Sequence, residues 1–512
     1  MSPQYYPQHG VVGRHEETFN DVLYAQLRKT PWWGISIAIH VLLGVLFWNM
    51  SFQSGLTEED ASIQASTQDN MDDKLDDVPP PIEEIPPIEE EQEPIEDPTI
   101  KDTPVSDHNE QDTDDEFDES RDDDLFSDAP FDGVSNNAQI GIGGGAGGSF
   151  GGRGGRRNLR AEGGGGTEGA VDLGLEWLKN HQDPEGYWDC DGFEAQCKLN
   201  KCGGPGYALF DPGITGLALL AFLGAGETHK TGRYRKTVRN GLKYLKAVQD
   251  PEGCFGPRTT NRFTYNHGTA ALAMAEAYAL TGSPLFKQSA QNAIDFVIKC
   301  QNPYLAWRYG VRPQDNDTSV TGWMVMALKS AKEAGKLRVP KEGFEGARAW
   351  MDKVTEPEYG KVGYTARGTG PARPQDIMDK FPPDKSEALT AVGILTRIFL
   401  GENPKQSEMI QKGAELCLKV LPEWDEASGS IDMYYWYYGS LALFQVGGEP
   451  WKAWNVAMKA AIIDKQRKDG DQRGSWDPIG PWGREGGRVY STAVCVMCLE
   501  VYYRYGRVFG LK

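Results

Sequence analysis

The feature that most constrains the fold is an internal repeat that runs from about residue 168 to the end of the chain. The stretches "GLEWLKNHQDPEGYW" (174–188) and "GLKYLKAVQDPEGCF" (241–255) share one pattern, and looser copies follow at 293–307, 346–364, 413–424 and 457–476. The same position of each copy is held by Gln182, Gln249, Gln301, Glu356, approximately Pro422, and Gln466. The copies lie roughly 45–65 residues apart, which is enough for two helices and their loops.

Each copy combines two helices of different character. The first is amphipathic and carries many charges, so we expect it to face solvent. The second, such as "PGITGLALLAFLGAG" (212–226), is apolar on nearly every face and is expected to be buried. About six such hairpins predict an all-α fold, an α/α toroid in which outer helices surround inner helices and a central cavity. Closure of this double ring is inferred from the number of copies.

The repeat resembles the QW repeat of squalene-hopene and oxidosqualene cyclases, and protein prenyltransferase β subunits share the same α/α toroid. The resemblance covers residues 168–512, and "QDPEGYW" (182–188) is its most specific part. It implies that the Gln amide ties the end of one helix to the next, with the aromatic residue stacked on it. This role is structural, because helix ends leave backbone groups unsatisfied. The structural repeat residues are then Gln182, Trp188, Gln249, Gln301, Trp307, Gln466 and Trp476.

The catalytic residues of these families are not matched. The cyclases protonate an alkene with the middle Asp of an Asp-x-Asp-Asp-Thr motif, and the corresponding stretch here is "QDNDT" (314–318). Asn316 occupies the position of the acid, and an amide has no acidic proton to donate. The prenyltransferases bind zinc through Asp-x-Cys and His-Thr, where this chain offers Asp315, Asp317 and Ser491-Thr492. We therefore expect neither cyclase nor zinc prenyltransferase activity, and no metal or cofactor.

The starts of the inner helices supply the candidate ligand-binding residues. Asp317 precedes an apolar helix and is a typical N-cap, whereas capping explains Asp315 less well. His267 opens the second inner helix, and aromatic residues gather in "YYWYY" (434–438) and near it. An aromatic cavity suits isoprenoid or sugar ligands, but the same residues also suit a filled core. The candidates are Asp315, Asp317, His267, Tyr435, Trp436, Tyr438, Trp482 and Tyr490.

An apolar segment near the N-terminus predicts a membrane anchor. Residues 31–52 contain a run of about 20 residues without Asp, Glu, Lys or Arg, which suffices to cross a bilayer. Arg28 and Lys29 precede the run and acidic residues follow it, so residues 1–30 are expected in the cytoplasm. We predict a single-pass protein of the cell inner membrane with an extracytoplasmic (periplasmic) toroid. A cleaved signal peptide is the alternative, but no A-x-A site follows the run.

The segment between anchor and repeat is predicted to be a tether. Residues 53–140 are acidic and rich in proline, which favours disorder, and residues 141–167 form a glycine-rich hinge. Much of the net charge of −21 belongs to this tether, so nothing indicates a nucleic-acid partner for the toroid at 168–512. Cys190, Cys197 and Cys202 cluster in one loop, which predicts one disulfide among them outside the cytoplasm.

The anchor contains Ser36 and His40 on one face of the predicted helix. An ionisable residue inside a membrane span is costly and points to function, although a chance histidine remains the alternative. The anchor and Pro-rich linker over residues 28–100 resemble the N-terminal part of TonB-type energy transducers. This resemblance implies ExbB/ExbD-type motor proteins as partners, with Ser36 and His40 as candidate membrane-coupling residues.

Three functions are compatible with these features. The first is a binding or coupling module, in which the tethered toroid holds an unknown ligand or protein partner. The second is an enzyme that acts on an isoprenoid or a glycan in the cavity, using Asp315 or Asp317. The third is a TonB-like energy-coupling protein that works through His40.

Overall fold

The computed structural model describes residues 164–260 and 262–504, and its regular elements there are helices. The predicted cytoplasmic tail, anchor with Ser36 and His40, and acidic tether lie outside the described residues, as does the glycine-rich hinge apart from residues 164–167. Among the described helices, none combines the length and the apolar character that a membrane span needs.

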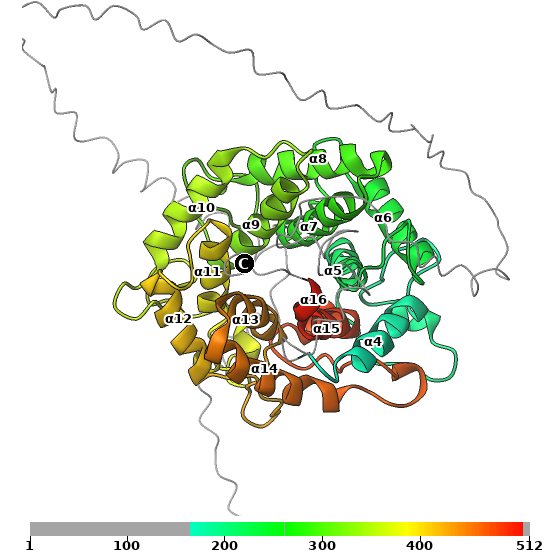
Figure 1. The fold of residues 1–512 in the computed structure, drawn as a ribbon. Coiled ribbons are helices and arrows are strands. Elements are labelled where there is room, and N and C mark those ends of the chain that lie inside the picture. The colour runs from blue at the N-terminus through cyan, green and yellow to red at the C-terminus, as the bar shows by residue number, and fades with distance from the viewer. Residues whose placement is uncertain (1–163, 261, 505–512) are drawn as a thin grey trace, which may run out of the picture. The chain divides into compact units, whose positions relative to one another are not determined.

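Six helical hairpins follow one another around a double ring (Figure 1). The outer helices are α4 (Glu168–Asn180), α6 (Arg235–Val248), α8 (Pro284–Cys300), α10 (Lys341–Val354), α12 (Glu408–Lys419) and α14 (Gly448–Ile462). The inner helices are α5 (Asp211–Gly224), α7 (Phe263–Thr281), α9 (Thr318–Glu333), α11 (Ala388–Phe399), α13 (Met433–Val446) and α15 (Gly483–Leu499). A short helix, α16 (Val501–Arg504), follows the last hairpin.

Contacts between neighbouring inner helices close the ring. Each inner helix packs on the next, and the last inner helix, α15, packs on α5 and α4 of the first hairpin. We call this junction between the last and the first hairpin the seam of the toroid. Small residues allow close approach: a Cβ atom on Gly216 of α5 would lie 2.8 Å from the backbone nitrogen of Ala270 in α7. The prediction of an all-α toroid with inner and outer helices is therefore confirmed for the described residues.

The difference between the two rings follows from their sequences. Every residue of α5 except Asp211 is buried, and most residues of α7 are buried as well. Both faces of an inner helix meet other helices. By contrast, α6 buries one stripe that includes Val238, Leu242 and Leu245, and it exposes its charged side chains. Burial of an apolar stripe holds each outer helix against the inner ring.

The glutamines of the repeat lie where hairpins meet. The Gln182 side-chain Nε2 donates to the carbonyl oxygens of Gly186 (2.8 Å) and Thr237 (2.9 Å), so it links the end of α4 to α6. Gln249 and Gln301 make the corresponding bonds to α8 and α10. Gln466 donates to Gly474 and, at 2.8 Å, to the carbonyl oxygen of Ala170 in α4. The sixth repeat is thereby joined to the first across the seam.

The aromatic residues of the repeat cap the outer helices. The indole Nε1 atoms of Trp188, Trp307 and Trp476 donate to carbonyl oxygens near the ends of α4, α8 and α14, at distances of 2.7–2.8 Å. In the degenerate fifth repeat, the Tyr435 hydroxyl lies 3.0 Å from the Cys417 carbonyl oxygen and 2.9 Å from that of Val420, at the end of α12. Tyr435 therefore supplies from an inner helix the bond that tryptophan supplies elsewhere.

Candidate functional site

A cavity of about 420 Å³ lies among the N-terminal ends of the inner helices. Helices α5, α7, α9, α13 and α15 contribute to its wall, together with the loop residue Tyr309 and the segment 372–374. The wall is mostly apolar and includes six aromatic side chains with polar edges: Tyr265, Tyr309, Trp323, Tyr434, Trp482 and Tyr490. A cavity of this size and character can hold a small organic molecule.

One polar group of the wall is a bridge between hydroxyls. The Ser319 hydroxyl accepts from the Tyr265 hydroxyl at 3.1 Å and lies 2.8 Å from the Tyr434 hydroxyl. These residues come from α9, α7 and α13, so the bridge links three inner helices. It satisfies the hydroxyls internally and fixes the aromatic rings in the wall.

Two other donors of the wall have no hydrogen-bond partner among the described residues. They are the Trp482 indole Nε1 and the Tyr490 hydroxyl, and both atoms are buried. Burial raises the pKa of Tyr490 well above its usual value, so the hydroxyl keeps its proton. Unsatisfied buried donors are costly, typically about 1–3 kcal/mol each. An acceptor oxygen of a ligand in the cavity would satisfy them.

Charged residues of the wall are paired. The Arg373 guanidinium donates to the Asp432 carboxylate at 2.6 Å, with both side chains almost fully buried, and its Nε atom lacks a partner among the described residues. In a second ion pair of the wall, the Glu485 carboxylate accepts from the Arg262 guanidinium at 2.7 Å. Among the described residues that line this cavity, Glu485 is the one carboxylate, and it is held in this ion pair.

Asp317 lies behind the wall. Its Oδ1 accepts from the Val320 backbone N–H at 2.7 Å, which makes it the N-cap of α9, and its side chain is fully buried. Its Oδ2 lies 3.4 Å from the Tyr364 hydroxyl and 3.8 Å from the Arg308 Nε atom. Burial raises the pKa of Asp317 to about 7, although the cap bond and Arg308 oppose this shift.

A chain of hydroxyls connects Asp317 to the cavity. The Tyr364 hydroxyl, which donates to Asp317, lies 2.6 Å from the hydroxyl of Tyr309 in the cavity wall. Through these two hydroxyls a proton on Asp317 could be exchanged with a group in the cavity.

Asp315 and Asn316 do not line the cavity. The Asp315 side chain is largely exposed and pairs with Arg308 at 2.6 Å, because its loop runs over the surface before α9. The Asn316 Oδ1 accepts from Asn302 Nδ2 and from the Ala306 N–H, both at 3.0 Å. The residue at the position of the cyclase acid therefore serves as a bridge within a loop.

The remaining candidates lie away from the cavity. His267 is fully buried, with Nδ1 accepting from the Phe255 N–H at 3.2 Å and Nε2 3.1 Å from the Ala293 carbonyl oxygen. Burial lowers its pKa to about 4, so it stays neutral and structural. Tyr435 caps α12, Trp436 packs on Trp424, and Tyr438 packs on Trp323. None of these four residues lines the cavity, because successive residues of a helix point in different directions.

Trp482 and Tyr490 are the two candidates that line the cavity. The sequence did not predict that Tyr265, Tyr309, Trp323 and Arg373 line the cavity, and Tyr434 was named only as part of the aromatic run. Nothing in the sequence of the run 434–438 distinguished Tyr434 from its aromatic neighbours. Tyr309 and Arg373 belong to loops, for which the helical pattern has no predictive value.

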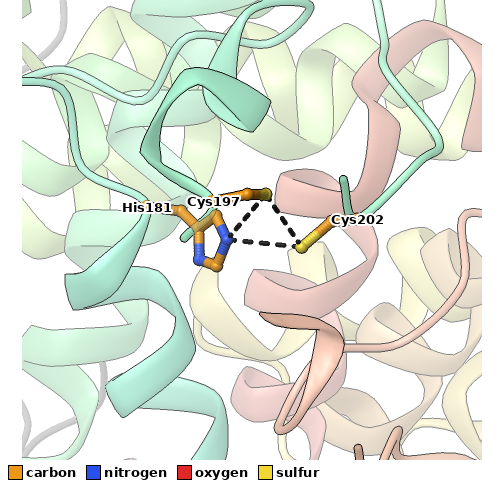
Figure 2. Close-up of side chains that lie close together, drawn as sticks. All are labelled: His181, Cys197 and Cys202. Carbon is orange, nitrogen blue, oxygen red and sulfur yellow. Dashed lines mark hydrogen bonds between the residues drawn. The ribbon is translucent and has the colours of Figure 1, made fainter. Parts of the chain in front are cut away.

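Outside this cavity, one group of side chains has the composition of a metal site. His181, Cys197 and Cys202 bring a ring nitrogen and two sulfur atoms within 4.8 Å of one another, as Figure 2 shows. A second group of Asp189, Asp191 and Asp211 is partly exposed. All eight cysteines are free thiols, so the predicted disulfide among Cys190, Cys197 and Cys202 is not formed. The expectation of no metal rested on the missing prenyltransferase ligands, and this group lies elsewhere in the sequence.

Comparison with known proteins places the chain near the cyclases. No family model matches it. It is 27% identical over 193 residues to the squalene–hopene cyclase of Bradyrhizobium diazoefficiens, which covers 35% of this chain and 28% of that protein. The matched region thus spans little more than a quarter of that curated relative.

Two solved structures are similar to the chain at low sequence identity. The type II terpene cyclase MstE from Scytonema is 14% identical, with a TM-score of 0.44 over 65% of this chain and 97% of that chain. An inactive variant of the α-1,6-mannanase GH76A of Salegentibacter sp. HEL1_6, in complex with α-1,6-mannotriose, is 12% identical, with a TM-score of 0.46 over 66% and 99%. Matches at this level say nothing of activity. The α/α toroid itself is seen in the packing of the described helices, as the repeat predicted.

Proposed function

We propose that the toroid is a ligand-binding module whose cavity holds an amphipathic molecule, with an apolar isoprenoid-like chain and an oxygen-rich head group. The observation that carries this proposal is the pair of unpartnered buried donors, Trp482 Nε1 and Tyr490 hydroxyl, in a mostly apolar aromatic wall. The apolar wall favours a hydrocarbon chain, because its burial removes apolar surface from water. The two donors favour an acceptor at one end of that chain.

The charges near the cavity support an acceptor-rich head group. Arg373 adds a third donor without a partner, its Nε atom, while its terminal nitrogen neutralises Asp432. A glycan would offer many hydroxyls along its whole length and needs polar partners along the whole site. The aliphatic part of this wall, which includes Ile214 and Leu217, favours an isoprenoid over a glycan.

The proposal does not include cyclisation or prenyl transfer. Asn316, at the position of the cyclase acid, holds a loop through two hydrogen bonds and lies outside the cavity wall. Glu485, the carboxylate of the wall, is held in an ion pair with Arg262. Neither group is arranged to protonate an alkene.

The proposed setting of this module rests on the sequence alone. Residues 31–52 would anchor the chain in the inner membrane, and the tether would carry the toroid outside the cytoplasm. If His40 couples to an ExbB/ExbD-type motor, ligand binding would be linked to energy from the membrane. Replacement of the anchor by an unrelated apolar helix of equal length distinguishes a passive anchor from one that couples to a motor. Function should survive the replacement if the anchor is passive.

Ligand titration tests the binding proposal. The full-length chain in detergent is titrated with farnesyl monophosphate or with α-1,6-mannotriose, and its tryptophan fluorescence is recorded. We expect saturable binding of the isoprenoid phosphate, weakened at least about fivefold in Tyr490→Phe because a hydrogen bond to a charged group is lost. Tyr304→Phe is the matched control, since Tyr304 is 93% exposed and lies outside the cavity wall. Binding of mannotriose instead would favour a glycan, and binding of neither would end the proposal.

A second candidate function is an enzyme that uses acid–base chemistry in the same cavity. The observation that favours it is the hydroxyl chain from Asp317 through Tyr364 to Tyr309, together with a pKa of Asp317 raised to about 7 by burial. A carboxyl group that titrates near neutral pH can act as an acid or a base. In this case Asp317→Asn would abolish turnover of the bound molecule while its affinity stays unchanged. A product formed equally by both proteins would rule out this role.

A further inference from the structure

Three potential metal ligands converge where the first hairpin meets the last. His181 lies at the C-terminal end of α4, while Cys197 follows the short helix η2 (Phe193–Gln196) and Cys202 lies in the same loop (Figure 2). The two Sγ atoms are 3.3 Å apart, and they lie 3.6 Å and 3.3 Å from the His181 Nε2 atom. A nitrogen and two sulfurs thus form a small triangle.

The imidazole is oriented as a ligand. Its Nδ1 atom lies 2.8 Å from the Trp177 carbonyl oxygen, which can only accept, so Nδ1 carries the hydrogen. The lone pair of neutral imidazole is then on Nε2, which faces the two sulfurs. Stacking on the Trp177 ring, with centroids 4.2 Å apart, fixes this orientation. Metal-bound histidines are held in the same way, with the other ring nitrogen donating to a carbonyl or carboxylate.

The spacing of the three atoms fits zinc better than a disulfide. Bonds of about 2.3 Å to sulfur and about 2.0–2.1 Å to nitrogen in a tetrahedron separate two sulfurs by roughly 3.8 Å, and sulfur from nitrogen by roughly 3.6 Å. The observed triangle is within about half an ångström of these edges. A disulfide would require the sulfurs to approach to about 2.05 Å, and it would leave the His181 lone pair with nothing to bind.

The charges and the surroundings also fit a divalent ion. Zinc with two thiolates and a neutral imidazole is electrically neutral, so its burial is less costly than burial of a single charge. His181 and Cys202 are buried, and Cys197 is half-buried. No fourth His, Cys or carboxylate of the described residues joins the group. A cavity of about 130 Å³, which Lys198 and Asp471 also line, lies against His181. Water would supply the fourth ligand of a zinc ion with three protein ligands.

The loop that carries the cysteines holds the seam of the toroid together. The Asp471 carbonyl oxygen accepts from the Trp177 indole at 2.8 Å and lies 3.1 Å from the Cys202 Sγ atom. The Asp471 carboxylate accepts from the Asn200 N–H at 2.8 Å. From the other side of the seam, Arg488 of α15 donates to the Gly203 carbonyl oxygen at 2.9 Å. A metal ion in this loop would therefore fasten α4 to the segment that leads into α15.

We propose that His181, Cys197 and Cys202 bind one zinc ion, which stabilises the closure of the ring between its first and last hairpins. This site is separate from the ligand cavity, and neither proposal depends on the other.

Metal analysis of the full-length chain tests this proposal. The chain is purified in detergent with a thiol reductant, loaded with zinc and freed of excess metal, and its zinc content is measured by mass spectrometry. We expect about one zinc per chain, falling to roughly a tenth or less in Cys197→Ser and in His181→Gln. Cobalt(II) in place of zinc should give the wild-type protein a thiolate-to-metal charge-transfer band, which does not depend on any variant folding.

Cys254→Ser is the matched control, because Cys254 is fully buried but lies outside the cluster. It should retain about one zinc. A chelator should lower the melting temperature of the wild type and of Cys254→Ser by at least about 5 °C, and it should leave Cys197→Ser unchanged. Absence of zinc and of the cobalt band in the wild type would overturn the proposal. So would equal zinc in Cys197→Ser, or a peptide map that joins Cys197 to Cys202 by a disulfide in the reduced, zinc-loaded protein.

Discussion

The Asp317→Asn substitution should change how the stability of the toroid depends on pH. Asp317 is fully buried at the start of α9, where burial raises its pKa to about 7. In the unfolded chain an aspartate titrates near about 3.9. Between these two values the folded protein holds the proton and the unfolded chain has lost it. The free energy of unfolding therefore falls as pH rises from about 4 to about 7, because the folded state binds more protons.

The magnitude follows from the shift. About three pKa units correspond to roughly 4 kcal/mol, at about 1.36 kcal/mol per unit, and this is an upper bound for a single buried carboxyl. Asparagine is uncharged throughout and keeps the side-chain oxygen that accepts the Val320 N–H, so the cap of α9 survives. We subtract the free energy of unfolding of the wild type from that of the variant. This difference should rise by roughly 2–4 kcal/mol as the pH is raised from 4.5 to 8.5.

Urea unfolding of the two full-length proteins at several pH values, followed by circular dichroism, measures this difference. Titration of the other groups cancels when the wild-type value is subtracted from the value for the variant. Asp384→Asn, at an exposed aspartate before α11, is the matched control for the same chemical change outside the buried site. A constant difference for Asp317→Asn would refute the reasoning. A difference that falls with pH would mean that Arg308, 3.8 Å away, outweighs burial.

Three further predictions follow from other parts of the chain. Gln466→Ala should destabilise the fold by about 1–3 kcal/mol in urea, since it removes two hydrogen bonds to the buried carbonyl groups of Ala170 and Gly474, whereas Gln411→Ala at an exposed position should have little effect. Tyr490→Phe should leave the stability of the ligand-free protein equal or raise it by about 1 kcal/mol, because the lost hydroxyl had no partner; marked destabilisation would contradict this. A reporter fused after Lys512 that fluoresces only in the cytoplasm should stay dark, and a bright signal would reverse the predicted topology.

The ring could be predicted from the sequence because its physical causes are local and repeated. An amphipathic stripe and a fully apolar helix alternate along the chain, and this pattern suffices to assign outer and inner positions. Gln182 and Gln249 recur at the same place because each satisfies carbonyl groups at the same junction. Even the degenerate fifth copy keeps the junction, with Tyr435 in place of tryptophan, although no pattern pointed to that exchange.

The wall of the cavity was less predictable because it depends on the rotation of each inner helix. In the run 434–438, Tyr434 reaches the cavity, whereas Tyr435 turns outward to α12 and Trp436 packs on Trp424. Hydrophobicity is equal for all of these residues, so only the packing of neighbouring helices decides between them. Loop residues such as Arg373 depend on tertiary contacts alone, here with Asp432.

Closure of the ring connects the cavity to the seam. Trp482, Glu485 and Tyr490 of the cavity wall all lie at the start of α15, the helix that completes the ring against α4 and α5. Two contacts join the segment before this helix to the first hairpin: the Gln466 amide on Ala170, and the Cys202 contact to Asp471. An open ring would expose the apolar inner helices to water, which burial across the seam prevents.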